Sequence, residues 1–425
     1  MSLAGLRDRI PVVNSWLLTA TFFFIPIQVA PAHVLSAMML LLLSLQRDVG
    51  QRLLETAREP LVWMVLTVYA FLLVSLLWSS DLQWGRDLIG RHKFFLLFPL
   101  YFAVARPEHF GRYVAAFLAS IAFCEALAFY NWIQLHVWPE LPEGIRVRKD
   151  PADTAPFVDR IFYTPILAFA GYLAGHRVLF GTLAWRWRMV YAALLVATTF
   201  NLIIAGGRAG LIGFLVMLVL LAFQRLGRRP LVASSVAATM VAALVLGGYH
   251  GNDYFKSRVD DGIETLVHYE QHPESSASLR LVYVKNALRI VSEHPLLGVG
   301  IGDYRSEYER VNAAHTPDWA PAWNPHNYYL FVLTAAGLPA GIALVVLLFY
   351  PLWRHSPADG RERMRRALPI LMITICLLES YLLRSNVSLM CMLFTAALWR
   401  IAPASPASRV YHDRVGPSRP DAMRS

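Results

Sequence analysis

The sequence predicts an all-α polytopic membrane protein. Of its 425 residues, 56% are apolar or aromatic and only 16% are charged, whereas soluble globular domains carry about 25% charged residues. The apolar residues are gathered into long runs, and a membrane-spanning helix needs roughly 20 of them. A polar segment at residues 250–326 interrupts this pattern once. A connection of that length is usually functional in a compact protein.

The apolar runs predict about twelve transmembrane helices. The second, fourth and sixth runs are short, so the number could fall by one or two. Tryptophans recur at the ends of runs, as at Trp16 and Trp353, which is typical of anchors at the membrane interface. The twelve runs lie near residues 12–30, 33–46, 60–78, 92–105, 112–136, 161–176, 188–205, 209–224, 230–249, 327–353, 367–383 and 386–402.

These runs divide the chain into four parts. Residues 1–249 are predicted to hold transmembrane helices 1 to 9, and residues 327–402 to hold helices 10 to 12. Between them, residues 250–326 form one large loop. The last part, residues 403–425, is rich in Pro, Ser and Arg, and we expect it to be a disordered cytoplasmic tail.

The arginines predict the orientation. Short loops rich in basic residues stay in the cytoplasm, and an inside N-terminus places the loops near residues 47–58, 225–229 and 354–366 on that side. The loop at 250–326 and the turn at Arg384 then fall outside. The net charge of +10 therefore reflects topology and requires no nucleic-acid partner. Cys124, Cys376 and Cys391 lie inside apolar runs, so no disulfide, metal site or cofactor is predicted.

Arg208 stands in the glycine-rich turn Gly206–Gly210 (GGRAG) between two apolar runs. A charge at membrane depth costs about 2.5 to 3.5 kcal/mol, which favours a positioned and partnered role. The glycines allow a sharp turn and the close approach of a ligand. The alternative is an arginine that extends to the lipid headgroups.

Arg280 lies in the first turn of a helix predicted at residues 276–291, which begins at a serine and ends before Pro295. A cation there opposes the helix dipole, which makes sense if an anion binds at that end. A solvated arginine on a helix face is an equally good interpretation. The glycines at 298–302 lack a surrounding strand-turn-helix unit, so they indicate a turn and not a dinucleotide-binding loop.

His326 opens the tenth run and could accept a proton. A lone interfacial histidine would be the simpler interpretation, but the predicted topology places His326 on the same face as Arg208 and Arg280. One histidine and two arginines suit a reaction that deprotonates a hydroxyl and neutralises a phosphate-rich leaving group. Asp303 or Glu307 could orient His326.

Further candidates for substrate binding lie nearby on the same predicted side. They could hold an anionic partner, or they could contact lipid headgroups. These residues are Arg86 and Arg91 in one outer loop, Arg146, Arg148 and Lys149 in another, and Tyr328 beside His326.

Three motifs together resemble the O-antigen ligase superfamily. They are the GGRAG turn, the Ser-Leu-Arg segment at 278–280 followed by residues 294–300 (HPLLGVG), and His326-Asn327 followed by residues 336–341 (AGLPAG). This superfamily also contains O-antigen polymerases and protein O-oligosaccharyltransferases. The present turn has Gly-Gly where many relatives have a small hydroxyl residue before the arginine.

The resemblance implies a GT-C-like glycosyltransferase of the bacterial inner membrane, with its active site facing the periplasm. Such an enzyme would transfer a polysaccharide from undecaprenyl diphosphate to a sugar hydroxyl of lipid A-core, among membrane lipids. His326 would be the general base, and Arg208 and Arg280 would hold the diphosphate. The reaction would be inverting and independent of metal or other cofactors.

Two alternatives to the ligase are open at this stage. The first is another transferase of the same superfamily, a polymerase or a protein O-oligosaccharyltransferase. The second is a transporter of lipid-linked glycan or solute. A transporter is expected to contain an inverted repeat with paired broken helices, and the sequence shows no such symmetry.

Overall fold

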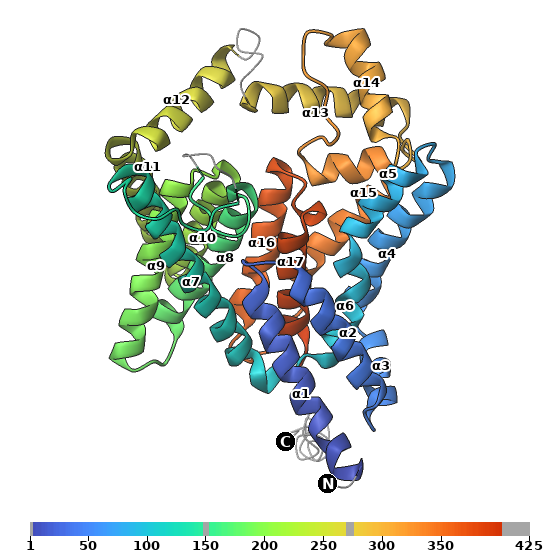
Figure 1. The fold of residues 1–425 in the computed structure, drawn as a ribbon, viewed down its shortest axis with the longest axis vertical. Coiled ribbons are helices and arrows are strands. Elements are labelled where there is room, and N and C mark those ends of the chain that lie inside the picture. The colour runs from blue at the N-terminus through green and yellow to red at the C-terminus, as the bar shows by residue number, and fades with distance from the viewer. Residues whose placement is uncertain (1–2, 148–152, 269–275, 402–425) are drawn as a thin grey trace, which may run out of the picture.

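The computed structural model describes residues 3–147, 153–268 and 276–401, and these residues contain helices and no strands. Long apolar helices form a bundle. Three other helices, which are more polar, cover one end of it (Figure 1). The helices are α1 Leu3–Phe24, α2 Ala30–Ser44, α3 Val49–Ala57, α4 Pro60–Val74, η1 Ser75–Trp78, α5 Leu82–Arg91, α6 Lys93–Val104, η2 Pro107–His109, α7 Phe110–His136, α8 Arg160–Phe180, α9 Trp185–Ala205, α10 Arg208–Leu226, α11 Pro230–Gly251, α12 Asp253–His268, α13 Ser276–Glu293, α14 Tyr304–His315, α15 Tyr328–Trp353, α16 Glu362–Leu378, η4 Tyr381–Leu383 and α17 Ser385–Trp399.

Each of the twelve predicted runs coincides with a helix, but not every helix meets the criteria for a membrane span. Among the described residues, six helices are long and apolar enough: α4 with η1, η2 with α7, α9, α10, α11 and α15. A seventh results if α2 and α3, which are bent by 116°, count as one broken span. The structure therefore confirms a polytopic α-helical membrane protein, whereas the number twelve is not confirmed.

The segment between α11 and α15 folds into α12, α13 and α14, which lie at the opposite end of the molecule from α3 and the start of α1 (Figure 1). The helix predicted at residues 276–291 is confirmed as α13. This helix packs on α15 and α14, and Tyr283, Ala287 and Ile290 on its inner face are buried. The polar segment therefore has a small core of its own, joined to the bundle through α15.

A break in α15 joins this segment to the bundle. Gly337 has φ 74° and ψ −171°, so the helix is interrupted there. The freed carbonyls of Thr334 and Ala335 accept hydrogen bonds from the backbone N–H groups of Val299 (2.8 Å) and Gly300 (3.1 Å). The glycines at 298–302 thus form a turn and not a dinucleotide loop, as the sequence predicted. The structure adds that this turn packs against the broken helix.

The glycines around Arg208 serve helix packing. Gly206 ends α9 in the left-handed conformation with φ 64°. A Cβ atom on Gly207 or Gly210 would lie 2.1 to 2.9 Å from side-chain atoms of Thr164 on α8. The sequence suggested that a ligand approaches these glycines. In the structure, α8 occupies that space.

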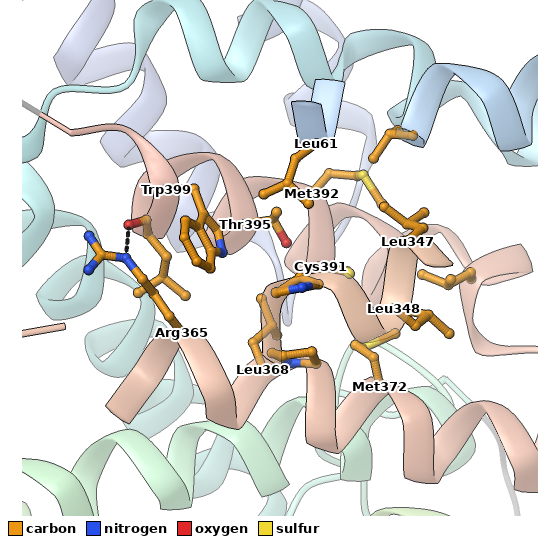
Figure 2. A pocket seen from close by; sticks show the side chains of 15 residues that line it. Leu61, Leu347, Leu348, Arg365, Leu368, Met372, Cys391, Met392, Thr395 and Trp399 are labelled. Carbon is orange, nitrogen blue, oxygen red and sulfur yellow. Dashed lines mark hydrogen bonds between the residues drawn. The ribbon is translucent and has the colours of Figure 1, made fainter. Parts of the chain in front are cut away.

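A small cavity lies inside the bundle between α4, α15, α16 and α17 (Figure 2). Its volume is about 30 Å³, and a single water needs roughly 10 to 15 Å³ by the same kind of measure. Arg365 lies at its edge with a fully buried side chain. The guanidinium is satisfied, since Nε donates to the carbonyl of Leu398 (2.8 Å) and both terminal nitrogens donate to Asp359. This cavity is a packing feature, too small for a substrate.

Replacing Gly210 with alanine is expected to lower the midpoint of thermal unfolding of the purified protein. The new Cβ would lie 2.3 Å from Thr164 Cβ and 2.4 Å from its carbonyl carbon, and overpacking of this kind typically costs 1 to about 3 kcal/mol. Gly247→Ala on α11 is the matched control, because no atom lies within 4 Å of its Cβ position. Equal midpoints for the two variants would contradict this packing.

Candidate functional site

Glu379 is the centre of the candidate site. The predicted apolar run at 367–383 includes this residue, but α16 ends at Leu378 and Glu379 follows it in extended backbone conformation. The residue therefore lies in the turn between α16 and α17, at the end of the bundle covered by α13. Its carboxylate side chain is only 1% exposed. A buried charge is costly unless it is paired and hydrogen-bonded.

One carboxylate oxygen of Glu379 contacts two of the predicted site residues. Oε2 lies 2.6 Å from Nδ1 of His326 and 3.5 Å from a terminal nitrogen of Arg280. His326 comes from the loop before α15, and Arg280 from α13. The structure therefore brings two of the three residues that the sequence singled out onto one buried charge.

The other oxygen, Oε1, is held by groups from the neighbouring turns. It accepts hydrogen bonds from the backbone N–H of Ser380 (3.0 Å), from Arg384 (3.2 Å) and from the side-chain amide of Asn324 (3.4 Å). Burial by itself raises the pKa of Glu379. The hydrogen bond and charge of His326, followed by the charges of Arg384 and Arg280, outweigh burial and lower that pKa to about 2. The carboxyl is therefore anionic at neutral pH.

The backbone of His326 is held in an unusual conformation. Its φ angle is 50°. Among the residues that the structure describes, no other non-glycine residue has a positive φ. Such backbone strain persists where the surroundings impose it, often at functional sites. Here Asn324 Oδ1 accepts from the N–H of His326 (3.0 Å) and from the hydroxyl of Ser380 (2.6 Å). The loop conformation is thus tied to the same turn that carries Glu379.

The imidazole of His326 is fixed on two sides. Its ring stacks on Tyr283 of α13, with 5.6 Å between the centroids and 20° between the planes. Because Glu379 is anionic, Nδ1 carries the proton that is donated to it. In the neutral form of the ring, Nε2 is then the acceptor nitrogen, on a side chain that remains 26% exposed. This arrangement is suited to accepting a proton from a substrate.

Arg208 is placed differently from Arg280. It begins α10 and lies under α12, in a narrow cleft with Phe255 and Val259. Its guanidinium is 3.7 Å from the carboxylate of Asp261 on α12. Arg208 therefore belongs to the end of the bundle that carries Glu379, but its ion pair is with another carboxylate.

Three further candidates are described by the structure: Arg86 and Arg91 lie on α5, and Tyr328 begins α15. Arg86 is exposed. Arg91 is partly buried, with its guanidinium carbon 5.7 Å from the ring of Trp84. Tyr328 is fully buried, and its hydroxyl lies 2.9 Å from Nε2 of His92. The proposed substrate contact at Tyr328 is therefore not supported, since this side chain faces the protein interior.

The candidates in the loop after α7 are only partly described. Arg146 has a side chain that is 9% exposed and lies 3.4 Å from Glu143. Arg148 and Lys149 lie outside the described residues. The structure shows no contact between Arg146 and the Glu379 cluster within the part of the chain that it describes.

The two carboxylates that the sequence suggested for orienting His326 have other roles. Asp303 accepts from the backbone N–H groups of Ser80 (2.7 Å) and Asp81 (2.9 Å), and so ties the segment before α14 to the turn before α5. Glu307 pairs with Arg310 at 2.6 Å and lies near His294 on the outer face of α13 and α14. Glu379 takes the orienting position instead.

Glu379 had a sequence signal that the prediction did not use. An ionisable residue within an apolar run is a functional candidate by default, and Glu379 is such a residue in the run at 367–383. Arg384 was placed on the outer side only as part of a turn. Their spacing of five residues gave no indication that both would meet His326.

The fold and the site together define a class, a polytopic α-helical membrane protein with a buried ionic cluster at one end of its bundle. A comparison with known families agrees with the motifs. Residues 192–345 match the sequence model of a family described as O-antigen ligase. Over this segment the chain is similar to the O-antigen ligase family. The matched segment includes Arg208, Arg280 and His326, and ends before Glu379.

A second similarity covers less of the chain. A digeranylgeranylglyceryl phosphate synthase from Ignicoccus hospitalis is 28% identical over 148 residues, which are 33% of this chain and 44% of that protein. The chain thus spans less than half the length of the curated relative that it matches.

Glu379→Gln is expected to destabilise the folded protein much more than the matched variant Glu307→Gln. Removing one member of a buried charge cluster typically costs 3 to about 5 kcal/mol, whereas an ion pair near the surface is worth about 0 to 1 kcal/mol. Arg310, the partner of Glu307, is half exposed. Thermal unfolding in detergent measures both variants. Similar losses would show that the Glu379 cluster is not a structural centre.

Proposed function

We propose that this protein is an O-antigen ligase. It transfers a polysaccharide from undecaprenyl diphosphate to a sugar hydroxyl of lipid A-core. The observation that carries this proposal is the 2.6 Å hydrogen bond between Nδ1 of His326 and the buried carboxylate of Glu379. The similarity of residues 192–345 to the O-antigen ligase family and the arginines around this pair support it.

In the proposed reaction, Nε2 of His326 removes the proton from the acceptor hydroxyl. The acceptor oxygen attacks the anomeric carbon from the side opposite the diphosphate, so a new glycosidic bond forms with inversion. The bond between the anomeric carbon and the phosphate oxygen breaks, and undecaprenyl diphosphate leaves with the electron pair. Glu379 stabilises the imidazolium that forms, and general base catalysis is typically worth 10² to about 10⁴ in rate.

The arginines act on the leaving group. Arg280 is 33% exposed and touches Glu379 through one terminal nitrogen at 3.5 Å, a distance at which the hydrogen bond is weak. The guanidinium can therefore exchange this contact for a phosphate oxygen, which binds arginine more strongly and often in bidentate fashion. We propose that Arg208 meets the second phosphate, with Asp261 as its partner in the absence of donor.

We further propose the membrane topology on which this reaction depends. The distribution of arginines supports an inside N-terminus, with residues 250–326 as a periplasmic loop between nine helices and three. The Glu379 cluster then faces the periplasm of a bacterial inner membrane, and the polyprenyl tail of the donor lies among lipids beside a GT-C-like bundle. Metal and other cofactors have no assigned part in this scheme.

Replacing His326 with alanine is expected to reduce transfer at least 10²-fold, because the general base is lost. The assay combines purified protein, undecaprenyl-diphosphate-linked polysaccharide and lipid A-core in detergent, and measures capped core. His315→Ala is the matched control, since His315 is exposed at the end of α14 and is expected to leave the rate unchanged.

The same assay separates the ligase from its relatives. If wild-type protein elongates the lipid-linked glycan or modifies a protein acceptor, and leaves lipid A-core unmodified, the ligase assignment is wrong. If folded His326→Ala protein transfers at the wild-type rate, the assignment of the base is wrong.

A further inference from the structure

Another cavity lies between α5, α14 and the loop before His326. It has a volume of about 470 Å³ and is lined by two aromatic and three charged side chains, namely Trp84 and Arg91 of α5, Arg305 and Glu309 of α14, and Trp323 of the loop before His326. Binding sites for small ligands typically measure 300 to about 1,000 Å³. The proposed reaction does not use any of these five side chains.

The lining suits a sugar that carries negative charge. The rings of Trp84 and Trp323 meet edge to face, with centroids 5.8 Å apart. Indole faces carry partial negative charge and pack against weakly positive C–H groups, such as those on one face of a pyranose ring. The guanidinium of Arg91 lies 5.7 and 5.5 Å from the two ring centroids and offers donors to a phosphate or carboxylate.

The charges in the cavity are only loosely satisfied. Arg305 and Glu309 form an ion pair at 3.2 Å on one face of α14, with side chains 68% and 50% exposed. An exposed pair of this kind contributes little to stability, so an anionic ligand can replace Glu309 as the partner of Arg305. Burial, and after it the charge of Arg384, lower the pKa of Arg91. A bound anion would relieve this crowding of cations.

Side-chain contacts connect the wall of this cavity to the candidate base. Trp323 in its wall is also contacted by Arg384, whose guanidinium carbon lies 5.1 Å from the ring. Arg384 in turn donates to Glu379 at 3.2 Å, the carboxylate that holds His326. Trp323 precedes His326 by three residues. Trp323, Arg384 and Glu379 thus form a continuous series of contacts from the cavity wall to His326.

We propose that this cavity binds the acceptor, a phosphorylated oligosaccharide, and presents its terminal hydroxyl to His326. This inference rests on the proposed function and adds to it a binding subsite for the acceptor. The two indoles hold sugar rings, and Arg91 and Arg305 bind phosphate. The donor diphosphate is held elsewhere, by Arg280 and Arg208.

The test measures binding without any transfer. The probes are the soluble oligosaccharide released from lipid A-core by mild acid, and the same oligosaccharide after phosphatase treatment. Calorimetry with the full-length protein gives both dissociation constants. Wild-type protein is expected to bind the phosphorylated probe at least tenfold more tightly than the dephosphorylated one.

The variants assign the parts of the cavity. Arg305→Gln is expected to weaken binding of the phosphorylated probe about tenfold and to leave the other probe unaffected, since the exposed Arg305 contributes little to folding. Trp84→Ala is expected to weaken binding of both probes. Lys285→Gln, at an exposed site on α13, is the charge-matched control and is expected to behave like wild type.

Wild-type affinity of Arg305→Gln and Trp84→Ala for both probes would overturn this inference, even if transfer requires His326. Conversely, cavity-dependent binding by a protein that does not transfer glycan to lipid A-core would contradict the proposed function and leave the subsite standing. The transfer assay provides a further check on Arg305→Gln and Trp84→Ala. If these variants raise the KM for the donor and not the KM for the acceptor, the acceptor assignment is wrong.

Discussion

The burial of one negative charge organises this end of the molecule. Taking a carboxylate out of water costs several kcal/mol, and only close partners recover that cost. Glu379 obtains its partners from three separate segments: Asn324 and His326 in the loop before α15, Arg280 on α13, and Arg384 before α17. Because Arg280 and His326 are distant from Glu379 in sequence, the charge is fully satisfied only when α13, α15, α16 and α17 have assembled. The same requirement fixes the ring and the backbone of His326.

The positions of these partners depend on backbone contacts farther away. The break in α15 at Gly337 frees the carbonyls that receive residues 299 and 300, and Asp303 binds the turn before α5. These contacts hold α13 and α14 on the bundle. They therefore place Arg280 next to Glu379 and Tyr283 next to His326. They also bring α5 and α14 together around Trp84 and Arg305. The candidate catalytic cluster and the proposed acceptor cavity thus share one scaffold, with Trp323 and Arg384 between them.

The sequence predicted the helices well because long apolar runs have few other structures available in a membrane. It also selected Arg280, as a cation in the first turn of a predicted helix, and His326, at the start of an apolar run. It did not find Glu379, because no periodicity tells which carboxylate a distant histidine will meet. Asp303 and Glu307 are nearer to His326 in sequence, but backbone N–H groups and Arg310 already satisfy them. The glycines beside Arg208 suggested ligand approach, while Thr164 of α8 occupies that space. Packing between distant helices decides all of these outcomes.

The central claim is that anionic Glu379 prepares His326 as the base, and the turnover of Glu379 variants in the reconstituted transfer assay tests it most directly. Glu379→Gln keeps the shape of the side chain but removes the charge that stabilises the imidazolium. Corrected for the folded fraction, its kcat is expected to fall about 10²-fold or more, with the KM for the donor changed less than about threefold. Glu379→Asp, which keeps the charge, is expected to recover part of the loss and the wild-type dependence of kcat on pH. A Glu379→Gln protein with wild-type kcat and pH dependence would contradict the account.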